Sequence, residues 1–319
     1  MAPPIEQLEL DGLPVYRTDA GPPFVVALLF RVGRSDETLA TGGITHLVEH
    51  LVFPNEDPIG IDSTGEVSGT ETIAAVGGSE QVAVDFMRRI AENCASPPLE
   101  RLEIERQILQ AEAAGSSYGS GQALRALRFG TVGHGQGSYE EYGLRRLDAA
   151  AVEQWAHERF GRANAAACLT GPLPDDFDIP LRSGGARVPP PEPAPIRGLQ
   201  LPAYYEAGPP GELAVSFVGQ RSSALRTAAD VFEHRVRQRL RHELGLSYAV
   251  ISDYEVLTAE QAQFGTVVDF LNPNAERARD ELLTIVDEIA ATERRRRSSK
   301  GSSTDCAGTG RARLTRPDG

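Results

Sequence analysis

The sequence predicts an α+β fold made of two related layered domains, each a mainly antiparallel sheet covered by helices. Apolar runs of strand length alternate with amphipathic segments of helical length up to about Leu181. A similar series of strand, helix, two strands and helix follows a proline-rich segment at 189–195. The repetition indicates a diverged internal repeat.

In the first half, turn residues bracket the apolar runs and so define the expected elements. The run 24–32, for example, lies between Gly21-Pro22-Pro23 and Gly33, which is typical of a buried strand. We expect strands at 24–32, 72–76 and 164–171. We expect helices at 44–53, 79–93, 99–114 and 148–160. Residues 54–69 are expected to form a loop.

The second half is expected to hold the same kinds of element in the same order. We expect strands at 213–218, 248–252 and 264–270, and helices at 222–244 and from Asn272-Pro273 to about Thr292. We place a first domain at 1–185, a proline-rich linker at 186–198 and a second, apparently truncated domain at 199–293. The arginine-rich segment 294–319 is expected to be a disordered tail, and the C-terminus to be truncated or frame-shifted.

Composition excludes some classes of function. The formal net charge of −13 argues against nucleic acid as a partner. No apolar run is long enough to span a membrane, and Met1 to Leu10 lacks the apolar core of a signal peptide, so we expect a cytoplasmic protein. Cys94 and Cys168 are expected to be buried thiols, because the three cysteines form no disulfide framework.

The stretch His46-Leu47-Val48-Glu49-His50 contains the residues that could form a metal site. Residues four apart lie on one face of a helix, so His46 and His50 project together as a pair of potential zinc ligands. Glu49 can reach a water molecule held on that metal. The alternative is a buried helix with two hydrogen-bonded histidines and a surface glutamate.

A catalytic zinc takes a third protein ligand, and the sequence offers several. The candidates are Glu71, Glu105, Glu112 and His134. Glu105 and Glu112 are seven residues apart and therefore share a helix face. One carboxylate can bind metal while the other accepts a hydrogen bond from a ligand imidazole. Spacing alone does not decide among the candidates.

The segment Val26 to Phe53 resembles the pitrilysin/insulinase family of zinc metallopeptidases, and is nearest its short chains such as the mitochondrial processing peptidases. The shared features are a strand, a glycine-containing connection and the inverted zinc-peptidase helix motif, here His46 to His50. The segment 105–112 is similar to the family's second motif. That similarity implies Glu112 as the third zinc ligand and Glu105 as a residue that supports the site. Tyr139 to Val152 also follows the family pattern.

A third similarity lies in Leu240 to Tyr248. In the family, an arginine and a tyrosine at these positions contact the substrate backbone and the developing oxyanion, which implies these roles for Arg241 and Tyr248. Family members close two such chains into a chamber. The resemblance therefore implies a zinc-dependent endopeptidase acting on peptides or unfolded chains, as a homodimer or as a heterodimer with a related subunit.

Two departures from the family pattern leave a rival hypothesis open. The segment 54–69 is shorter than usual, and Gly65 to Thr70 replaces the sequence of the family's substrate-binding edge strand. The C-terminal part is also short. The rival is a non-catalytic partner subunit that binds peptides. A purely structural zinc site is a third alternative, although such sites are normally rich in cysteine. His134, His157, His234 and His242 are expected to be surface or loop histidines.

Overall fold

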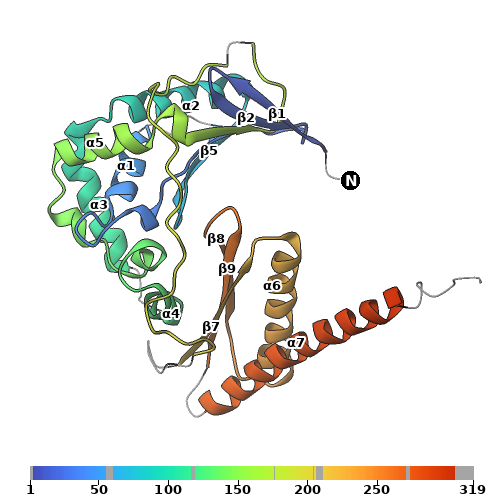
Figure 1. The fold of residues 1–319 in the computed structure, drawn as a ribbon. Helices are drawn as coiled ribbons and strands as arrows, with labels where there is room; N and C mark the ends of the chain where they lie inside the picture. The colour runs from blue at the N-terminus through green and yellow to red at the C-terminus, as the bar shows by residue number, and fades with distance from the viewer. Residues whose placement is uncertain are drawn as a thin grey trace, which may run out of the picture. The chain divides into compact units, whose positions relative to one another are not determined.

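The computed structural model describes residues 3–54, 60–115, 119–175, 177–203, 205, 211–270 and 274–305. These residues form a mixed α+β architecture in which a largely antiparallel sheet is covered by helices (Figure 1). The predicted fold class is therefore confirmed.

The larger sheet has six strands in the order β1-β2-β6-β3-β5-β4. The strands are β1 (Ile5–Leu10), β2 (Leu13–Thr18), β3 (Phe24–Phe30), β4 (Asp62–Val67), β5 (Thr72–Gly78) and β6 (Ala165–Leu169). Only the pairing of β2 with β6 is parallel among the described pairs of this sheet. Strand β4 therefore lies at one edge of an antiparallel run, beside β5.

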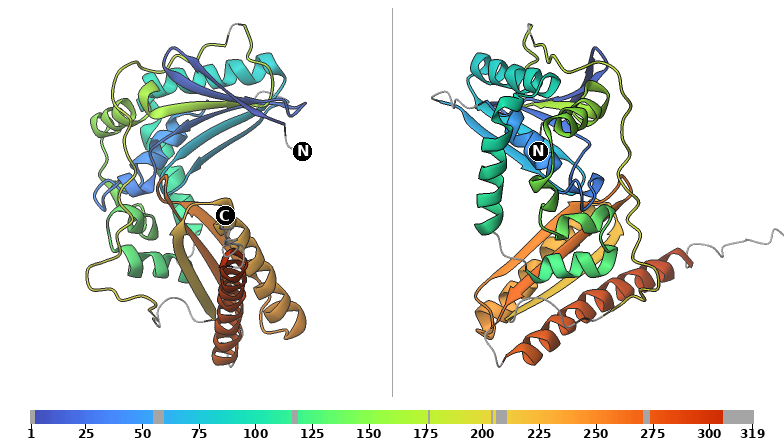
Figure 2. Two further views of the ribbon diagram at one scale, coloured as in Figure 1. Left: turned by 45° about the vertical axis from the view of Figure 1, so that its right-hand side comes forward. Right: turned by 90° about the vertical axis from the view of Figure 1, so that its left-hand side faces the viewer.

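Helices cover one face of this sheet, and the residues of its strands therefore alternate between buried and half-buried positions. In β3, Val26, Leu28 and Phe30 are buried, whereas the residues between them are half-buried. The covering elements are α1 (Ile44–Val52), α2 (Glu80–Ala95), α3 (Leu102–Gly115) and α5 (Ala149–Arg159). α2 lies along β3 and β5, and α1 packs against the other three helices (Figure 2). A fully buried Leu or Phe contributes about 1.5–3 kcal/mol to stability.

A second sheet has three strands in the order β7-β9-β8. Its elements are β7 (Glu212–Gln220), α6 (Ser223–Val236), the π-helix η6 (Arg237–Glu243), β8 (Val250–Val256), β9 (Gln261–Asp269) and α7 (Ala275–Asp305). The order β7-β9-β8 repeats the order β3-β5-β4, and in both sets a helix follows the first strand. This repetition agrees with an internal repeat. None of the helices in the described ranges is both long and apolar enough to cross a bilayer.

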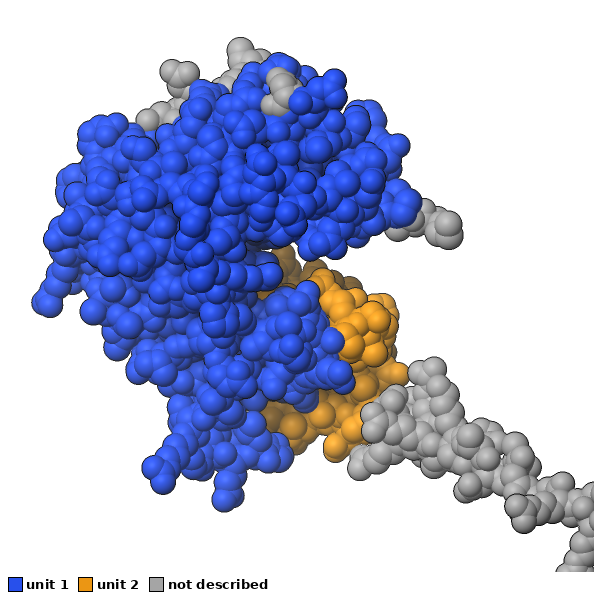
Figure 3. Space-filling model, turned by 45° about the horizontal axis from the view of Figure 1, so that its top comes forward, with its two compact units in different colours: residues 1–209, 215–221, 254–265 blue, residues 210–214, 222–253, 266–319 orange. Residues whose placement is uncertain are grey.

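The chain divides into two compact units, which Figure 3 colours separately. The first unit contains 1–209, 215–221 and 254–265, and the second contains 210–214, 222–253 and 266–319. The limits that the sequence suggested for the domains and the linker stay a prediction.

Several expected elements differ from those observed. The loop expected at 54–69 contains β4, which the pattern missed because Asp62-Ser63-Thr64-Gly65-Glu66 has no apolar residue. The helix expected at 222–244 changes to π geometry at Arg237. α7 extends past Thr292 to Asp305, so part of the expected tail is helical, and residues 306–319 lie outside the described ranges. The expected capping pair Asn272-Pro273 and the third cysteine, Cys306, also lie outside them. β1, β2 and α4 (Ser120–Phe129) were not expected.

Candidate metal centre

Helix α1 is fixed by its apolar face, and its polar residues lie together on the other side. Ile44, Leu47, Val48, Leu51 and Val52 are buried in the core of the first unit. The ligand atoms of His46, Glu49 and His50 all lie within 4.8 Å of one another. The helix begins at Gly43, which has a φ of 94°. A Cβ there would lie 2.7 Å from the Glu141 Cβ, so glycine is required.

Each histidine of this cluster is oriented by a carboxylate from a different element. The Nδ1 of His46 lies 2.9 Å from Glu141 Oε1, and the Nδ1 of His50 lies 3.2 Å from Glu105 Oε2. An ionised carboxylate only accepts, so each Nδ1 carries the hydrogen and donates it. In the neutral imidazoles the lone pairs are then on Nε2, which is the tautomer that binds a metal.

Glu112 lies opposite these two lone pairs. Its Oε1 is 3.8 Å from His50 Nε2 and its Oε2 is 4.0 Å from His46 Nε2. Two donors at about 2.0–2.1 Å from a tetrahedral zinc lie about 3.3–3.4 Å apart. The two distances from Glu112 are slightly longer than that spacing, and its side chain is half exposed. Two imidazoles and one carboxylate fit zinc, and they leave a coordination position for water.

Arginines lie behind the two orienting carboxylates. Arg101 forms an ion pair with the buried Glu105 one helical turn away, and Arg34 Nη2 lies 3.9 Å from Glu141 Oε1. Burial lowers the pKa of His46, but the hydrogen bond to Glu141 and the negative charges of Glu141 and Glu49 together outweigh it, and the net pKa is raised. Burial raises the pKa of Glu141, but the hydrogen bond to His46 and the positive charges of His46, Arg34 and His50 together outweigh it, and the net pKa is lowered. The pair is thus held by charge as well as by geometry.

Glu49 lies between the histidines and the edge strand β4. Burial raises the pKa of this carboxyl, which suits a group that must take up a proton. A Cβ on Gly65 of β4 would lie 1.7 Å from Glu49 Oε1 and 2.7 Å from the Phe53 ring. Glycine at position 65 therefore lets the carboxylate of Glu49 reach the backbone of the edge strand.

Glu37 positions the start of the helix. Its Oε2 accepts the N–H of Gly43 at 2.9 Å and its Oε1 accepts the N–H of Thr45 at 2.9 Å, which satisfies two donors at the N-terminus of α1. The side chain is buried, and this burial raises its pKa to about 7 in spite of the two hydrogen bonds. The same residue thus caps the helix and titrates near neutral pH.

Arg241 and Tyr248 lie in the second unit. The Arg241 guanidinium lies over the Tyr248 ring at 5.1 Å, and Tyr248 is 78% exposed. Asp269 Oδ1 accepts hydrogen bonds from Ser247 Oγ and from the N–H groups of Tyr248 and Ala249, at 2.8–2.9 Å. Asp269 therefore fixes the turn that presents Tyr248.

Two of the alternative third ligands are placed elsewhere. His134 was expected to be a surface or loop histidine; it lies in the short 3-10 segment Gly133–Ser138 and is buried, not at the surface. Its Nε2 donates to the Pro191 carbonyl at 2.9 Å and its Nδ1 lies 3.4 Å from Ser35 Oγ. Burial lowers its pKa. Glu71, between β4 and β5, is half-buried and has no described contact with the two histidines of α1. His234 and His242 are exposed, as expected, and His157 is half-buried. Cys94 is buried, but Cys168 is only partly so.

Sequence reasoning missed Glu141 and Asp269. Glu141 is 95 positions from His46, and no helical or strand period relates residues so far apart. The only signal was that 139–152 follows the family pattern, which gave Glu141 no role. Asp269 ends a strand, where an aspartate is common for many reasons.

Comparison with known proteins gives the fold. No protein-family profile and no curated protein sequence matches the chain. Solved structures do match. The peptidase M16 inactive domain from Pseudomonas fluorescens aligns with a TM-score of 0.69 and 16% identity over 94% of this chain and 84% of that one. A putative M16-like peptidase from Alicyclobacillus acidocaldarius aligns with a TM-score of 0.60 and 15% identity over 97% of this chain and 86% of that one. Pitrilysin aligns with a TM-score of 0.62 and 14% identity over 91% of this chain and 36% of that one.

The chain therefore has the fold of M16 peptidases. One of these structures is described as an inactive domain, so the fold alone does not decide whether a chain of this kind catalyses a reaction. What this chain can do depends on the donor set on α1 and α3.

Replacing Glu37 by Gln tests the cap of α1. Between pH 4.5 and 7 the folded protein keeps a proton that the unfolded chain releases, because the folded pKa is about 7. The associated stability is complete below pH 4.5 and is lost as the pH rises through 7. Between pH 4 and pH 8, the free energy of unfolding of wild type, measured with urea, should therefore fall by about 3 kcal/mol relative to that of Glu37→Gln. A difference that does not change with pH would contradict this account.

Replacing Glu141 by Gln tests the second orienting carboxylate. Residues that orient a metal-bound histidine typically account for about 10–100-fold in metal affinity, and we expect Glu141→Gln to lose that much zinc affinity. Titration against a chelator of known zinc affinity measures the loss. The control is Glu140→Gln, which removes a neighbouring exposed carboxylate. Equal zinc affinity in both variants would show that Glu141 does not support zinc binding.

Proposed function

We propose that this protein is a zinc-dependent endopeptidase of the pitrilysin/insulinase type, nearest the short two-domain chains of that family. The observation that carries the proposal is the arrangement of α1 and α3. Two imidazoles present Nε2 toward the carboxylate of Glu112, both Nδ1 atoms are held by carboxylates, and Glu49 lies beside them. A helix with two incidentally hydrogen-bonded histidines does not require four acidic residues to converge on it.

His46, His50 and Glu112 would hold the zinc, with Glu105 and Glu141 fixing the histidine tautomers. Zinc in such a site lowers the pKa of a water ligand and polarises a carbonyl group. Glu49 takes the proton of the attacking water and passes it to the leaving amine, a role that its raised pKa favours. Burial disfavours the charged form of this carboxylate, so it favours uptake of that proton.

The substrate is proposed to bind as an added strand on the outer edge of β4. Strand addition uses the backbone groups that an edge strand leaves for pairing, so it suits peptides and unfolded chains. Gly65 brings the backbone of β4 next to Glu49, which would place a paired peptide bond at the catalytic carboxylate. The shortened 54–69 segment therefore does not deprive the protein of an edge strand, since β4 is formed within it.

Arg241 and Tyr248 are proposed to stabilise the oxyanion of the tetrahedral intermediate. Donors fixed before the reaction are the effective ones for this task. The stacking of Arg241 on Tyr248 and the three hydrogen bonds to Asp269 provide such fixation. In the proposed assembly, a second chain, identical or related, supplies this pair to the zinc of the first.

The alternative is a non-catalytic subunit that binds peptides. One of the similar structures is described as an inactive M16 domain, which is consistent with this alternative. It would have no need for an intact donor set, whereas this chain keeps both histidines, Glu49 and Glu112 in place. We therefore favour the peptidase.

Replacing Glu49 by Gln separates the two functions. With zinc present, wild type should cleave a fluorogenic peptide library, and Glu49→Gln should lose about 10²–10⁴-fold in kcat/KM, since a positioned general base contributes that much. Zinc content should remain one per chain in both proteins. The control, Glu80→Gln, alters an exposed carboxylate at the start of α2 and should retain activity. If wild type and Glu49→Gln were equally inert while each held one zinc, the peptidase proposal would be wrong.

A further inference from the structure

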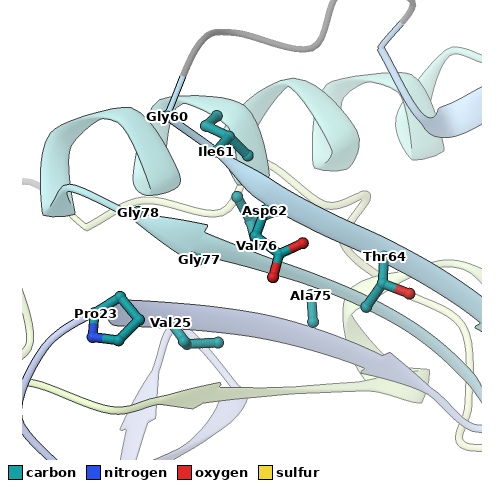
Figure 4. Close-up of a pocket in the computed structure, with 10 residues that line it drawn as sticks. All are labelled: Pro23, Val25, Gly60, Ile61, Asp62, Thr64, Ala75, Val76, Gly77 and Gly78. Carbon is teal, nitrogen blue, oxygen red and sulfur yellow. The ribbon is translucent and has the colours of Figure 1, made fainter.

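Outside the candidate metal centre, an open pocket lies on the six-stranded sheet, beside the start of β4 and the end of β5 (Figure 4). Glycines and small apolar side chains make up most of its lining, and Asp62 is the charged residue among them. One exposed carboxylate over an apolar floor does not define the chemistry of a ligand. The second unit contains a more specific arrangement, which concerns the position of Arg241.

Arg241 lies in a segment of π geometry, where a regular α-helix was expected. The segment η6 runs from Arg237 to Glu243, and the N–H of Leu244 donates to the carbonyl of Arg239, five residues earlier, at 3.1 Å. A π turn holds about one residue more than an α turn, so side chains along it are rotated by up to about 100° relative to a continuous α-helix. The direction of the Arg241 side chain therefore depends on this geometry being kept.

The chain reverses directly after the π segment and brings Tyr248 back beside Arg241. Gly245 has a φ of 60°, and the N–H of Leu246 donates to the Leu240 carbonyl at 2.8 Å. Leu240 and Leu246 are both buried, so the reversal is anchored by apolar side chains as well as by the hydrogen bond. The end of the segment and the turn that follows it thus form one packed structure.

The two members of the stacked pair are held in different ways. Tyr248 is fixed through its backbone N–H, which donates to Asp269. Arg241 is exposed and lies over the Tyr248 ring, and within the described residues no carboxylate is at ion-pair distance from its guanidinium. The position of Arg241 is therefore set mainly by the backbone of η6.

Arg239 ties the π turn to the neighbouring helix α7 and to its own end. Its Nε and Nη2 donate to the two carboxylate oxygens of Glu281 on α7, at 2.8 and 3.3 Å, and its Nη1 donates to Glu243 Oε2 at 3.0 Å. Its backbone carbonyl accepts the N–H of Leu244 that closes the π turn. A bidentate pair between a guanidinium and a carboxylate fixes orientation as well as distance. The contacts of this one residue therefore oppose a change of the segment to α geometry.

We propose that Arg239 is a positioning residue, which holds the π turn so that the Arg241 guanidinium lies over the Tyr248 ring. The inference rests on the proposed function, in which Arg241 and Tyr248 meet the oxyanion of the tetrahedral intermediate. Donors are effective in that task when they are fixed before the reaction. Arg239 touches neither substrate nor zinc in this role, and it acts through the backbone of η6.

The position of Arg241 can be measured by NMR without zinc or substrate. In the full chain labelled with ¹³C in arginine, the side-chain CH₂ signals of Arg241 should be shifted by the Tyr248 ring, and Tyr248→Leu gives their unshifted positions. In Arg239→Gln and in Glu281→Gln, we expect these signals to move toward the unshifted positions. The double variant should show no larger change than Arg239→Gln, because both substitutions break the same pair.

A matched control is available on the same two helices. Arg235 Nη1 lies 3.8 Å from Glu288 Oε2, so this ion pair also joins α6 to α7, but it precedes the π turn. Arg235→Gln should leave the Arg241 signals in place. The proposal is overturned if the signals stay in place in both Arg239→Gln and Glu281→Gln, or if Arg235→Gln moves them equally.

Turnover of the fluorogenic peptides gives a second measurement. In Arg239→Gln, kcat should fall by about 10-fold, less than the loss of about 10²–10³-fold that follows removal of an oxyanion donor. KM should stay unchanged, because the interaction is made in the transition state. Arg235→Gln should keep the wild-type kcat, and an equal fall in both variants would overturn the proposal. If wild type cleaves no peptide, the peptidase proposal fails, and the NMR comparison still decides whether Arg239 positions Arg241.

Discussion

The candidate centre depends on the position of one buried helix. Five apolar residues of α1 lie in the core of the first unit, and this burial leaves a single orientation for His46, Glu49 and His50. Rotation of the helix would expose apolar surface at about 25 cal/mol per Å². Glu37 holds the start of the helix through two backbone N–H groups, and Gly43 allows the chain to approach Glu141 there. The geometry of the polar side therefore follows from the packing of the apolar side.

Around that helix, the acidic residues lie in three different surroundings. Glu105 and Glu141 accept hydrogen bonds from imidazole Nδ1 and are backed by arginines. Glu112 is half exposed and faces both Nε2 atoms. Glu49 is mostly buried, which raises its pKa, and it faces the edge strand at Gly65. The three roles that we propose for these residues, which are orientation, ligation and proton transfer, thus rest on differences in burial and in neighbours among chemically identical groups.

The fold class was predictable because it depends on local periods. The continuous apolar run of β3 and the helical spacing of His46 and His50 are visible in any short window of the sequence. Glu105 and Glu112 could be grouped for the same reason, since two turns of one helix relate them. Glu141 could not be found in this way, because only the tertiary fold brings it to His46. β4 was missed because an edge strand with one open face needs few apolar residues, and Asp62 to Glu66 contains none.

X-ray absorption at the zinc edge tests the central claim most directly. The protein, mixed with one equivalent of zinc, should bind it with two imidazole nitrogens and with carboxylate and water oxygens at about 2.0–2.1 Å, and without sulfur. In Glu112→Ala one carboxylate oxygen should be lost while both imidazoles remain. A shell that contains sulfur, a shell without imidazole, or no binding of zinc at all would contradict the account.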